Sequence, residues 1–404
     1  GEIFISRKNI LTICEIGNNH NGNLERGLNL IDSAAKTGVK AIKFQARNLE
    51  DCYIDISEDY LNATDYGTSY TIKQLKKFNL SQEDLSLLFK RVKEHNLICI
   101  CTHFDKSSAK WLINNEDVDA IKIASADMSN FDLLDVFKHT TKNLIISTGM
   151  HNESQISILS DWSYRNYLDV TFLHVNSTYP TPYDDVELLF MPKLTNYSTN
   201  KMFGYSGHER GYHVPIAACV LGAVIIEKHF TDNIYSEGND HKVSLLEDEF
   251  RAMVHQIKDI CISLGGQDKI KRISQGEKLN KISLSKGIYF AKDVQKGDII
   301  KEEHLLVRSP LVGVSVDMFK DVLGSTIQKN GKKNYPLKYS HIKRLDNNVK
   351  ELLNLNNFGL PVRFRDFVEI HQKFNPLFME YHMFASDLNV NPKNFRKELK
   401  GKTF

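Results

Sequence analysis

Short apolar runs rich in β-branched residues alternate with amphipathic stretches of helical length from Ile10 to Leu264, and this alternation limits the possible folds more than any other feature. Strand-like runs begin near eight positions: Ile10, Val39, Leu97, Ala120, Leu144, Val170, Met202 and Val224. Helical patterns lie between or after them at Leu24–Lys36, Leu85–His95, Ser129–His139, Glu153–Trp162 and Glu247–Leu264. Eight strand–helix units in about 255 residues predict an α/β fold, the (β/α)8 TIM barrel. A doubly wound sheet is the alternative, and the barrel is favoured because polar residues gather where the apolar runs end.

The sequence changes character after Gly265-Gly266. A polar stretch is followed by short strand patterns at Gly287–Ala291, Ile299–Ile300 and His304–Val307, separated by turn residues. We therefore expect a barrel at residues 1–266, a linker at 267–282, a small β-rich domain at 283–345 and a C-terminal extension at 346–404. The extension is of marginal length for an independent core. It is interpreted as a helical arm or as the start of a further domain.

Charge and composition exclude several classes of partner. The 404 residues carry 52 Lys+Arg and 50 Asp+Glu without a block of like charge, which argues against nucleic acid. The longest apolar stretch, Val214–Ile226, is too short to span a bilayer, and the first twenty residues contain no apolar leader. The six cysteines form no CxxC pair. We expect a cytoplasmic protein with no membrane or nucleic-acid partner.

Polar side chains recur where the eight apolar runs end. They are Glu15 after the first run, Lys43 and Gln45 on the second, Thr102 on the third, Lys122 and Ser125 on the fourth, Ser147 on the fifth, Ser177 and Tyr179 after the sixth, Ser206 and His208 on the seventh, and Glu227 and His229 on the eighth. Two lysines and several hydroxyls at one barrel end suit a phosphate group. Two histidines on neighbouring strands supply part of a metal site. Each residue alone is more simply a solvated or packed side chain, but eight polar strand ends would be costly to bury without a purpose.

The blocks at these strand ends resemble the N-acetylneuraminate (sialic acid) synthase family in order and spacing. They are Glu15–Gly22, Ile42–Gln45, Lys122–Ser125, Ser147–Met150, Tyr179–Pro182, Gly204–His208, Glu227–Phe230 and Asp240–Lys242. The similarity runs from Ile10 to Leu345. Within it, Ala291–Asp298 and Val307–Pro310 resemble the antifreeze-like (SAF) domain of these synthases.

The resemblance implies a reaction. The family condenses phosphoenolpyruvate with the open-chain aldehyde of an N-acetylated amino sugar, such as N-acetylmannosamine or a 2,4-diacetamido-trideoxyhexose, and gives a nine-carbon 2-keto acid and phosphate. It implies a divalent metal, Mn²⁺ or Mg²⁺, held by His208 and His229 as a Lewis acid. It further implies a homodimer in which the SAF domain of one subunit reaches over the barrel of the other.

The resemblance also implies roles for single residues. Glu15 and Glu227 are the candidates for proton transfer or for orienting water. Together with His208 and His229 they form the implied set of catalytic residues. The implied phosphoenolpyruvate site consists of Lys43, Gln45, Thr102, Lys122, Ser125, Ser147, Ser177 and Ser206. Tyr179, Asp240 and Arg308 match positions on the sugar side. Gly207, Ser177 and Asn239 depart from the family pattern, where Asp, Asn and Pro are common, and this weakens any inference about which sugar is used.

Two other functions stay open at this point. The first is a phosphoenolpyruvate-dependent synthase that uses a phosphorylated aldose to make a seven- or eight-carbon keto acid, against which the antifreeze-like module argues. The second is a non-catalytic sugar-binding barrel. The intact set of Lys43, Lys122, His208 and His229 argues against it, because buried charges without a function are costly. Within the tail, Leu360–Val368 and Phe378–Leu388 faintly resemble the beginning of a sugar-isomerase-like barrel.

Overall fold

The computed structural model describes residues 5–6, 8–63, 66–265, 270–342, 359–362 and 378–381. The chain divides into two units, Gly1–Lys269 and Ile270–Phe404, and each is described by itself.

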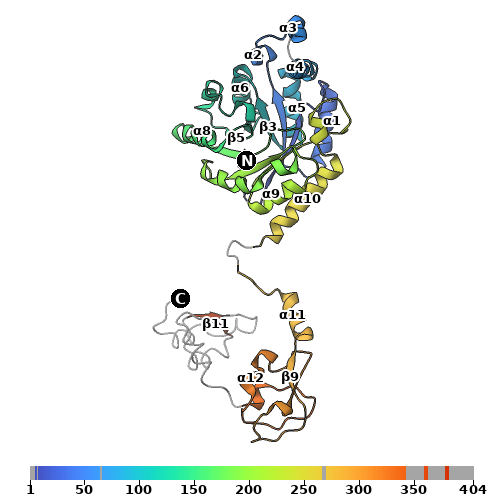
Figure 1. The fold of residues 1–404 in the computed structure, drawn as a ribbon, viewed down its shortest axis with the longest axis vertical. Helices are drawn as coiled ribbons and strands as arrows, with labels where there is room; N and C mark the ends of the chain where they lie inside the picture. Colours follow the sequence, from blue (N-terminus) through green and yellow to red (C-terminus); the bar gives the residue numbers. More distant parts are fainter. Residues whose placement is uncertain are drawn as a thin grey trace, which may run out of the picture. The chain divides into compact units, whose positions relative to one another are not determined.

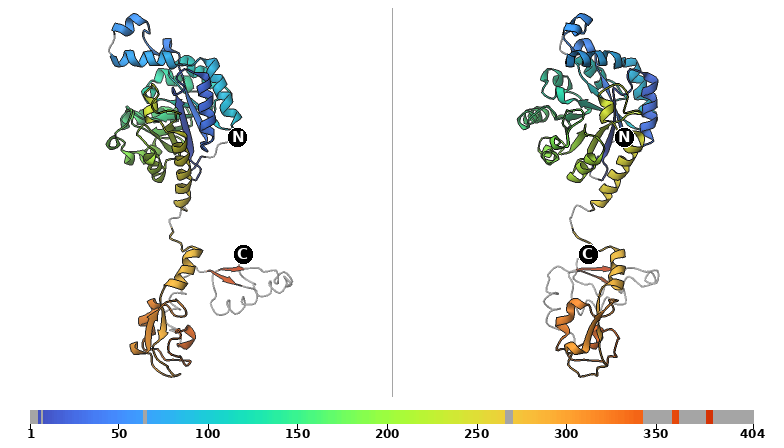
Figure 2. Two further views of the ribbon diagram at one scale, coloured as in Figure 1. Left: turned by 90° about the vertical axis from the view of Figure 1, so that its right-hand side faces the viewer. Right: turned by 45° about the vertical axis from the view of Figure 1, so that its right-hand side comes forward.

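The first unit is a closed barrel of eight parallel strands in sequence order, with β8 pairing back to β1. The strands are β1 (Leu11–Gly17), β2 (Ala41–Ala46), β3 (Ile98–His103), β4 (Ala120–Ile123), β5 (Asn143–Ser147), β6 (Val170–His174), β7 (Phe203–Gly207) and β8 (Ile225–His229). Helices surround the strands on the outside (Figure 1; Figure 2, right). This topology confirms the predicted barrel and excludes the doubly wound sheet. Each strand begins within two residues of the position predicted from the sequence.

The helices of this unit are α1 (Leu24–Ala35), α2 (Leu49–Cys52), α3 (Glu58–Ala63), α4 (Tyr66–Phe78), α5 (Gln82–Glu94), α6 (Lys106–Ile113), α7 (Phe131–Leu134), α8 (Glu153–Arg165), α9 (His213–Leu221) and α10 (Glu247–Ser263). Short 3-10 helices complete it: η1 (Ser125–Asp127), η2 (Asp135–Phe137), η3 (Tyr183–Asp185), η4 (Leu188–Asn196) and η5 (Asp240–Val243). The patterns that predicted α1, α8 and α10 match these helices closely. The sequence Ser81-x-x-Asp84 predicts an N-cap for α5, and the structure confirms it, because Ser81 accepts a hydrogen bond from the Asp84 N–H. The helix therefore begins at Gln82, directly after the cap and three residues before the apolar pattern.

Two helical segments differ from the sequence prediction. The pattern at Ser129–His139 forms only the short α7 and then η2. Asn130 caps α7 by accepting from the Leu133 N–H, and the chain tightens into a 3-10 turn at Asp135. Between β2 and α5, where no helix is predicted from the sequence, the structure has α2, α3 and α4.

Two apolar layers hold the barrel together. The outer layer joins the outward faces of the strands to the helices and buries large side chains such as Phe44, Phe89, Phe137 and Phe172. The inner layer fills the barrel with residues from its strands and with Val224, which directly precedes β8. Its members are Leu11, Ile13, Ala41, Ile100, Ala120, Ile145, Leu173, Val224 and Ile225. Each fully buried Leu, Ile or Phe contributes about 1.5–3 kcal/mol relative to an exposed one. The inner layer closes the barrel floor and leaves its carboxyl end for polar side chains.

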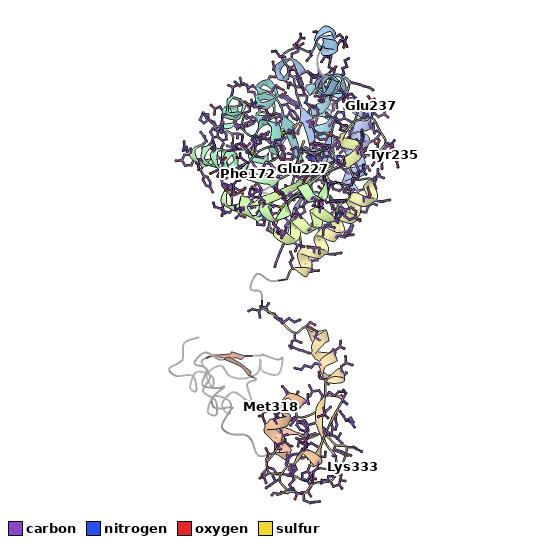
Figure 3. The ribbon with its side chains drawn as sticks, viewed as in Figure 1. Phe172, Glu227, Tyr235, Glu237, Met318 and Lys333 are labelled. Carbon is purple, nitrogen blue, oxygen red and sulfur yellow. The ribbon has the colours of Figure 1, made fainter. Side chains whose placement is uncertain are left out.

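The second unit has a core of its own. Its strands β9 (Gly287–Phe290) and β10 (Leu305–Arg308) pair antiparallel, and its helices are α11 (Gln275–Leu284), η6 (Glu302–His304), η7 (Val316–Met318), α12 (Phe319–Val322) and η8 (Tyr339–His341). The buried cluster consists of Ile288, Phe290, Val294, Ile300, Leu305, Val314, Val322, Ile327, Leu337 and Ile342. Met318 packs against this cluster, whereas Lys333, which Figure 3 also labels, is exposed.

Details of this unit refine the predicted organisation. The stretch predicted as a linker includes α11, which Ser274 and Glu277 begin with a capping box. The predicted strand at Ile299–Ile300 contributes one isolated bridge, from Ile299 to Thr326, because the turns on either side leave no room for a ladder. Beyond residue 342, β11 (Gly359–Val362) and β12 (Phe378–Tyr381) pair in parallel. The two tail segments that resemble a sugar-isomerase-like barrel, Leu360–Val368 and Phe378–Leu388, lie mostly outside the described residues.

Two observations bear on the expected environment. Among the described residues, no helix is long and apolar enough to cross a membrane. All six cysteines have free thiols, and five of them are buried.

Candidate active site

A cavity of about 250 Å³ lies at the carboxyl ends of the barrel strands. Its lining contains every site residue predicted in the barrel: Glu15, Lys43, Gln45, Thr102, Lys122, Ser125, Ser147, Ser177, Tyr179, Ser206, His208, Glu227, His229 and Asp240. Figure 3 labels Glu227, which β8 places within the barrel. The structure therefore brings fourteen predicted residues into one cavity.

The period of a β-strand explains why these side chains meet. In β1 the inward-facing Ile13 belongs to the apolar inner layer, and Glu15, two residues later, faces the same way. The same step of two leads from Ala41 to Lys43 in β2. It recurs in β3, β4, β5 and β8, from Ile100 to Thr102, Ala120 to Lys122, Ile145 to Ser147 and Ile225 to Glu227. The polar layer thus lies directly above the apolar one.

Lys43 lies between two carboxylates. Its Nζ is 3.2 Å from Glu15 Oε2 and 3.2 Å from Glu227 Oε1, and it donates to Thr102 Oγ1 at 3.2 Å. Burial would lower the pKa of Lys43, but Glu15 and Glu227 outweigh that effect and raise it. The sequence shows no acidic neighbour for Lys43, because both partners come from other strands. Lys43 is therefore a stable cation held by the barrel itself.

Lys122 has a different environment. Its Nζ donates to Ser147 Oγ at 2.6 Å, and no carboxylate in the described part of the chain forms an ion pair with it. Burial lowers the pKa of Lys122 to about 8, although Glu227 partly opposes the shift. Lys122 is thus a buried ammonium whose charge depends on pH near neutrality, and an incoming anion would stabilise that charge.

Glu227 is the most strongly shifted carboxyl group of the cavity. Burial alone would raise its pKa, but Lys122 and Lys43 outweigh burial and lower the pKa to about 2. Ser206 Oγ also donates to Glu227 Oε1 at 2.9 Å. Glu227 is therefore a carboxylate at neutral pH, which can accept a proton or a hydrogen bond but has none to donate.

Two hydroxyl groups converge above Gly149. A Cβ atom at this position would lie 2.3 Å from Ser177 Oγ and 2.8 Å from Ser125 Oγ, so the space over the Gly149 backbone belongs to these two side chains. Ser125 begins η1 after β4, and Ser177 follows β6. Hydroxyl groups that meet over a bare backbone next to Lys122 form a pocket for anionic oxygens.

The two predicted histidines are neighbours. The rings of His208 and His229 have centroids 5.5 Å apart, and Tyr179 stacks on His208 with centroids 4.0 Å apart. His208 Nδ1 lies 2.8 Å from the carbonyl oxygen of Asn176, which accepts from it in the neutral ring. Burial lowers the pKa of His208 to about 3. Its Nε2 therefore carries a free lone pair at neutral pH, the form that binds a metal.

These residues fit a divalent cation as two of its ligands. Among the described residues, no group of three or more His, Cys, Asp or Glu side chains could enclose a metal ion. Metal–nitrogen bonds are about 2.1 Å long, so two rings at this separation can share one ion. The buried Nδ1 of His229 also has no hydrogen-bond partner in the described structure. Such a cation would keep positions open for substrate and water, as catalytic metals do.

Sequence reasoning missed several residues of the cavity. Arg47 and Asn18 line it, and Arg47 Nη1 donates to Asn18 Oδ1 at 3.0 Å. Arg47 also donates to Gln45 Oε1, and its guanidinium lies 4.2 Å from the centre of the Phe104 ring. Arg47 directly follows β2 and continues the alternation of Lys43 and Gln45, which was the signal that could have identified the arginine.

Arg308 is the one predicted site residue outside the cavity. It ends β10 in the second unit, is exposed, and donates to the carbonyl oxygen of Val307 at 2.9 Å. Within the described residues no carboxylate forms an ion pair with it.

The fold and this cavity define a class: a (β/α)8 enzyme with a buried, charged site at the carboxyl end of its barrel. The sequence profile of the NeuB family matches residues 30–269, and that of the SAF domain matches residues 285–343. The chain belongs to the NeuB family and carries a C-terminal SAF domain.

Individual relatives support this assignment. The N,N'-diacetyllegionaminic acid synthase of Campylobacter jejuni is 32% identical over 330 residues, which cover 80% of this chain and 98% of that protein. A pseudaminic acid synthase of the same organism is 29% identical over 333 residues, covering 81% and 95%. The solved structure of an N-acetylneuraminic acid synthetase from Leptospira borgpetersenii, in complex with citrate, is 28% identical with a TM-score of 0.62, covering 69% and 94%.

Proposed function

We propose that this protein is a nonulosonic acid synthase, which condenses phosphoenolpyruvate with an N-acetylated amino sugar to give a nine-carbon 2-keto acid and phosphate. The observation that carries the proposal is the convergence of all fourteen predicted barrel residues on one cavity. Membership of the NeuB family and the names of its relatives support the same chemistry.

Phosphoenolpyruvate is assigned to the region between Lys43, Lys122 and the hydroxyl groups above Gly149. The two ammonium groups attract its negatively charged oxygens, and Thr102, Ser125, Ser147, Ser177 and Ser206 fix its orientation through hydrogen bonds. The methylene carbon C3 of phosphoenolpyruvate forms a bond to the aldehyde carbon of the sugar. Water adds to C2, which carries the phosphate ester, and the resulting tetrahedral centre loses phosphate to leave the keto group. Water must give up a proton and the aldehyde oxygen must gain one. Glu227, which is ionised at neutral pH, suits the first role.

A divalent cation at His208 and His229 would polarise the sugar aldehyde. The charge balance of the cavity favours such an ion, because Lys43, Lys122 and Arg47 are matched by Glu15, Glu227 and Asp240 before any anion binds. A phosphoenolpyruvate anion therefore needs further positive charge. Mn²⁺ and Mg²⁺ are the metals we propose.

The sugar is assigned to the outer edge of the cavity, where Tyr179 and Asp240 lie. A smaller cavity of about 130 Å³ shares Asn18 and Asp240 with this edge and is also lined by Thr71 and Gln74. We propose that it receives a substituent of the sugar. The relative whose product name includes two acetyl groups favours a diacetamido sugar among the candidates.

The proposed assembly is a homodimer in which Arg308 completes the site of the other subunit. Its exposed guanidinium has no carboxylate partner among the described residues, and it is well suited to bind an acyl oxygen through paired donors.

A substitution at Lys122 tests the assignment of the two substrates. Lys122→Met should raise the KM for phosphoenolpyruvate far more than the KM for the sugar, and the exposed variant Lys110→Met should change neither. Equal losses for both substrates with Lys122→Met would contradict the assignment.

A further inference from the structure

A buried ion pair joins Glu209, which follows β7, to Lys228 in β8. Lys228 Nζ lies 3.1 Å from Glu209 Oε1, and both side chains are 0% exposed. Lys228 also donates to the backbone carbonyl of Glu209, and the Tyr205 hydroxyl donates to Glu209 Oε2 at 2.7 Å. None of these residues lines the cavity, so the reaction chemistry does not account for the pair.

The position of the pair along the chain connects it to the histidines. Glu209 follows His208 directly, and Lys228 precedes His229 directly. The β7–β8 ladder ends with Gly207 opposite Lys228, so His208 and His229 lie just beyond the last paired residues. Because side chains alternate along a strand, His229 faces the cavity while Lys228 faces the outer layer. The ion pair therefore connects the segment that carries His208 to the strand that carries His229.

Gly207 leaves space for the Glu209 carboxylate. A Cβ atom at Gly207 would lie 2.6 Å from Glu209 Oε1, 2.7 Å from Glu209 Oε2 and 2.8 Å from Tyr205 Cε1. Gly207 does not have the positive φ that would require glycine. A side chain is thus excluded at position 207 by the carboxylate and the tyrosine ring, and not by backbone conformation.

We propose that Glu209 and Lys228 are positioning residues, which hold His208 and His229 at the separation that binds a divalent cation. This inference rests on the proposed function, because it assumes that the two histidines bind the metal. Outer partners of metal ligands commonly change metal affinity by about 10–100-fold when they are removed. A buried pair of full charges also favours one arrangement, because an unpaired partner in the interior is strongly disfavoured.

The first test measures Mn²⁺ binding to the full chain by calorimetry. Glu209→Gln should weaken Mn²⁺ binding by about 10–100-fold while phosphoenolpyruvate binding without metal stays within about threefold of the original. Asp132→Asn is the matched control, because it removes a carboxylate from the exposed Lys106 and should change neither affinity. Unchanged Mn²⁺ affinity in Glu209→Gln would overturn the inference.

Two double variants separate positioning from stability and carry the test if Glu209→Gln does not fold. The double variant Glu209→Gln with Lys228→Met leaves neither of these two positions charged. Its melting temperature should therefore stay near that of the original protein, and it should still bind Mn²⁺ weakly. Full recovery of Mn²⁺ affinity there would show that the pair only stabilises the fold.

Gly207→Asp with Glu209→Ala places a carboxylate where the Glu209 carboxylate was. It should bind Mn²⁺ better than Glu209→Ala alone, and no gain would contradict the inference.

The variant His229→Ala separates a failure of the positioning role from a failure of the proposed metal site. If Mn²⁺ binding depends on His229 but not on Glu209, only the positioning role fails. If Mn²⁺ binding does not depend on His229, the proposed metal site fails and the positioning role fails with it.

Discussion

At the scale of single residues, Lys122 links the structure to a pH dependence. Its pKa is lowered to about 8, so the side chain is cationic below that pH and neutral above it. An anionic substrate binds the cationic form better. We therefore expect kcat/KM for phosphoenolpyruvate to fall as the pH rises through about 8, and Lys122→Met to remove this limb of the profile. An unchanged alkaline limb in Lys122→Met would assign it to another group.

Gly149 gives a second prediction at this scale. In Gly149→Ala the new methyl group would displace the hydroxyls of Ser177 and Ser125, because it would lie 2.3 Å and 2.8 Å from them. We expect the KM for phosphoenolpyruvate to rise by at least about fivefold, since overpacking of this kind costs about 1–3 kcal/mol. The KM for the sugar should change little. Gly276→Ala in α11, where the nearest contact is 4.0 Å away, is the control. Normal phosphoenolpyruvate kinetics in Gly149→Ala would contradict the assigned pocket.

At the scale of secondary structure, the apolar inner layer supports the polar layer above it. Ile100 is fully buried in that layer, two residues before Thr102 on β3. Ile100→Ala should lower the free energy of unfolding by about 2–5 kcal/mol, as large-to-small core changes do. Ile158→Ala on the exposed face of α8 should stay within about 0.5 kcal/mol. Denaturant unfolding measures both, and equal effects would argue against a packed barrel interior.

The elements also show what a sequence can and cannot predict here. Strand ends such as Glu15 and Lys43 were predictable because alternation with period two is a local property. The pairing of Lys43 with Glu15 and Glu227 was not, since it depends on which strands are neighbours around the closed barrel. The buried partner of Lys228 was missed for the same reason. Local patterns thus predicted which residues face the cavity, whereas their charges and partners required the fold.

At the scale of the whole molecule, the proposed shared site predicts complementation between subunits. In a mixed dimer of Arg308→Ala chains with Lys122→Met chains, one barrel keeps its lysine and receives an intact arginine from its partner. Such a dimer should show about half the turnover of the original dimer, as two-fold symmetry with one intact site requires. Each variant alone should be nearly inactive. A purified mixed dimer without activity would contradict a site shared between subunits.

The central claim is that this chain joins phosphoenolpyruvate to an N-acetylated amino sugar. The most direct measurement is phosphate release in the presence of Mn²⁺, phosphoenolpyruvate and one aldose at a time, with mass spectrometry of the product. The panel holds N-acetylmannosamine, 2,4-diacetamido-trideoxyhexoses and phosphorylated four- and five-carbon aldoses. We expect stoichiometric phosphate and a nine-carbon 2-keto acid with an N-acetylated sugar, and far slower release from Lys122→Met at the same phosphoenolpyruvate concentration. Turnover confined to the phosphorylated aldoses, or none with any sugar in the panel, would contradict the account.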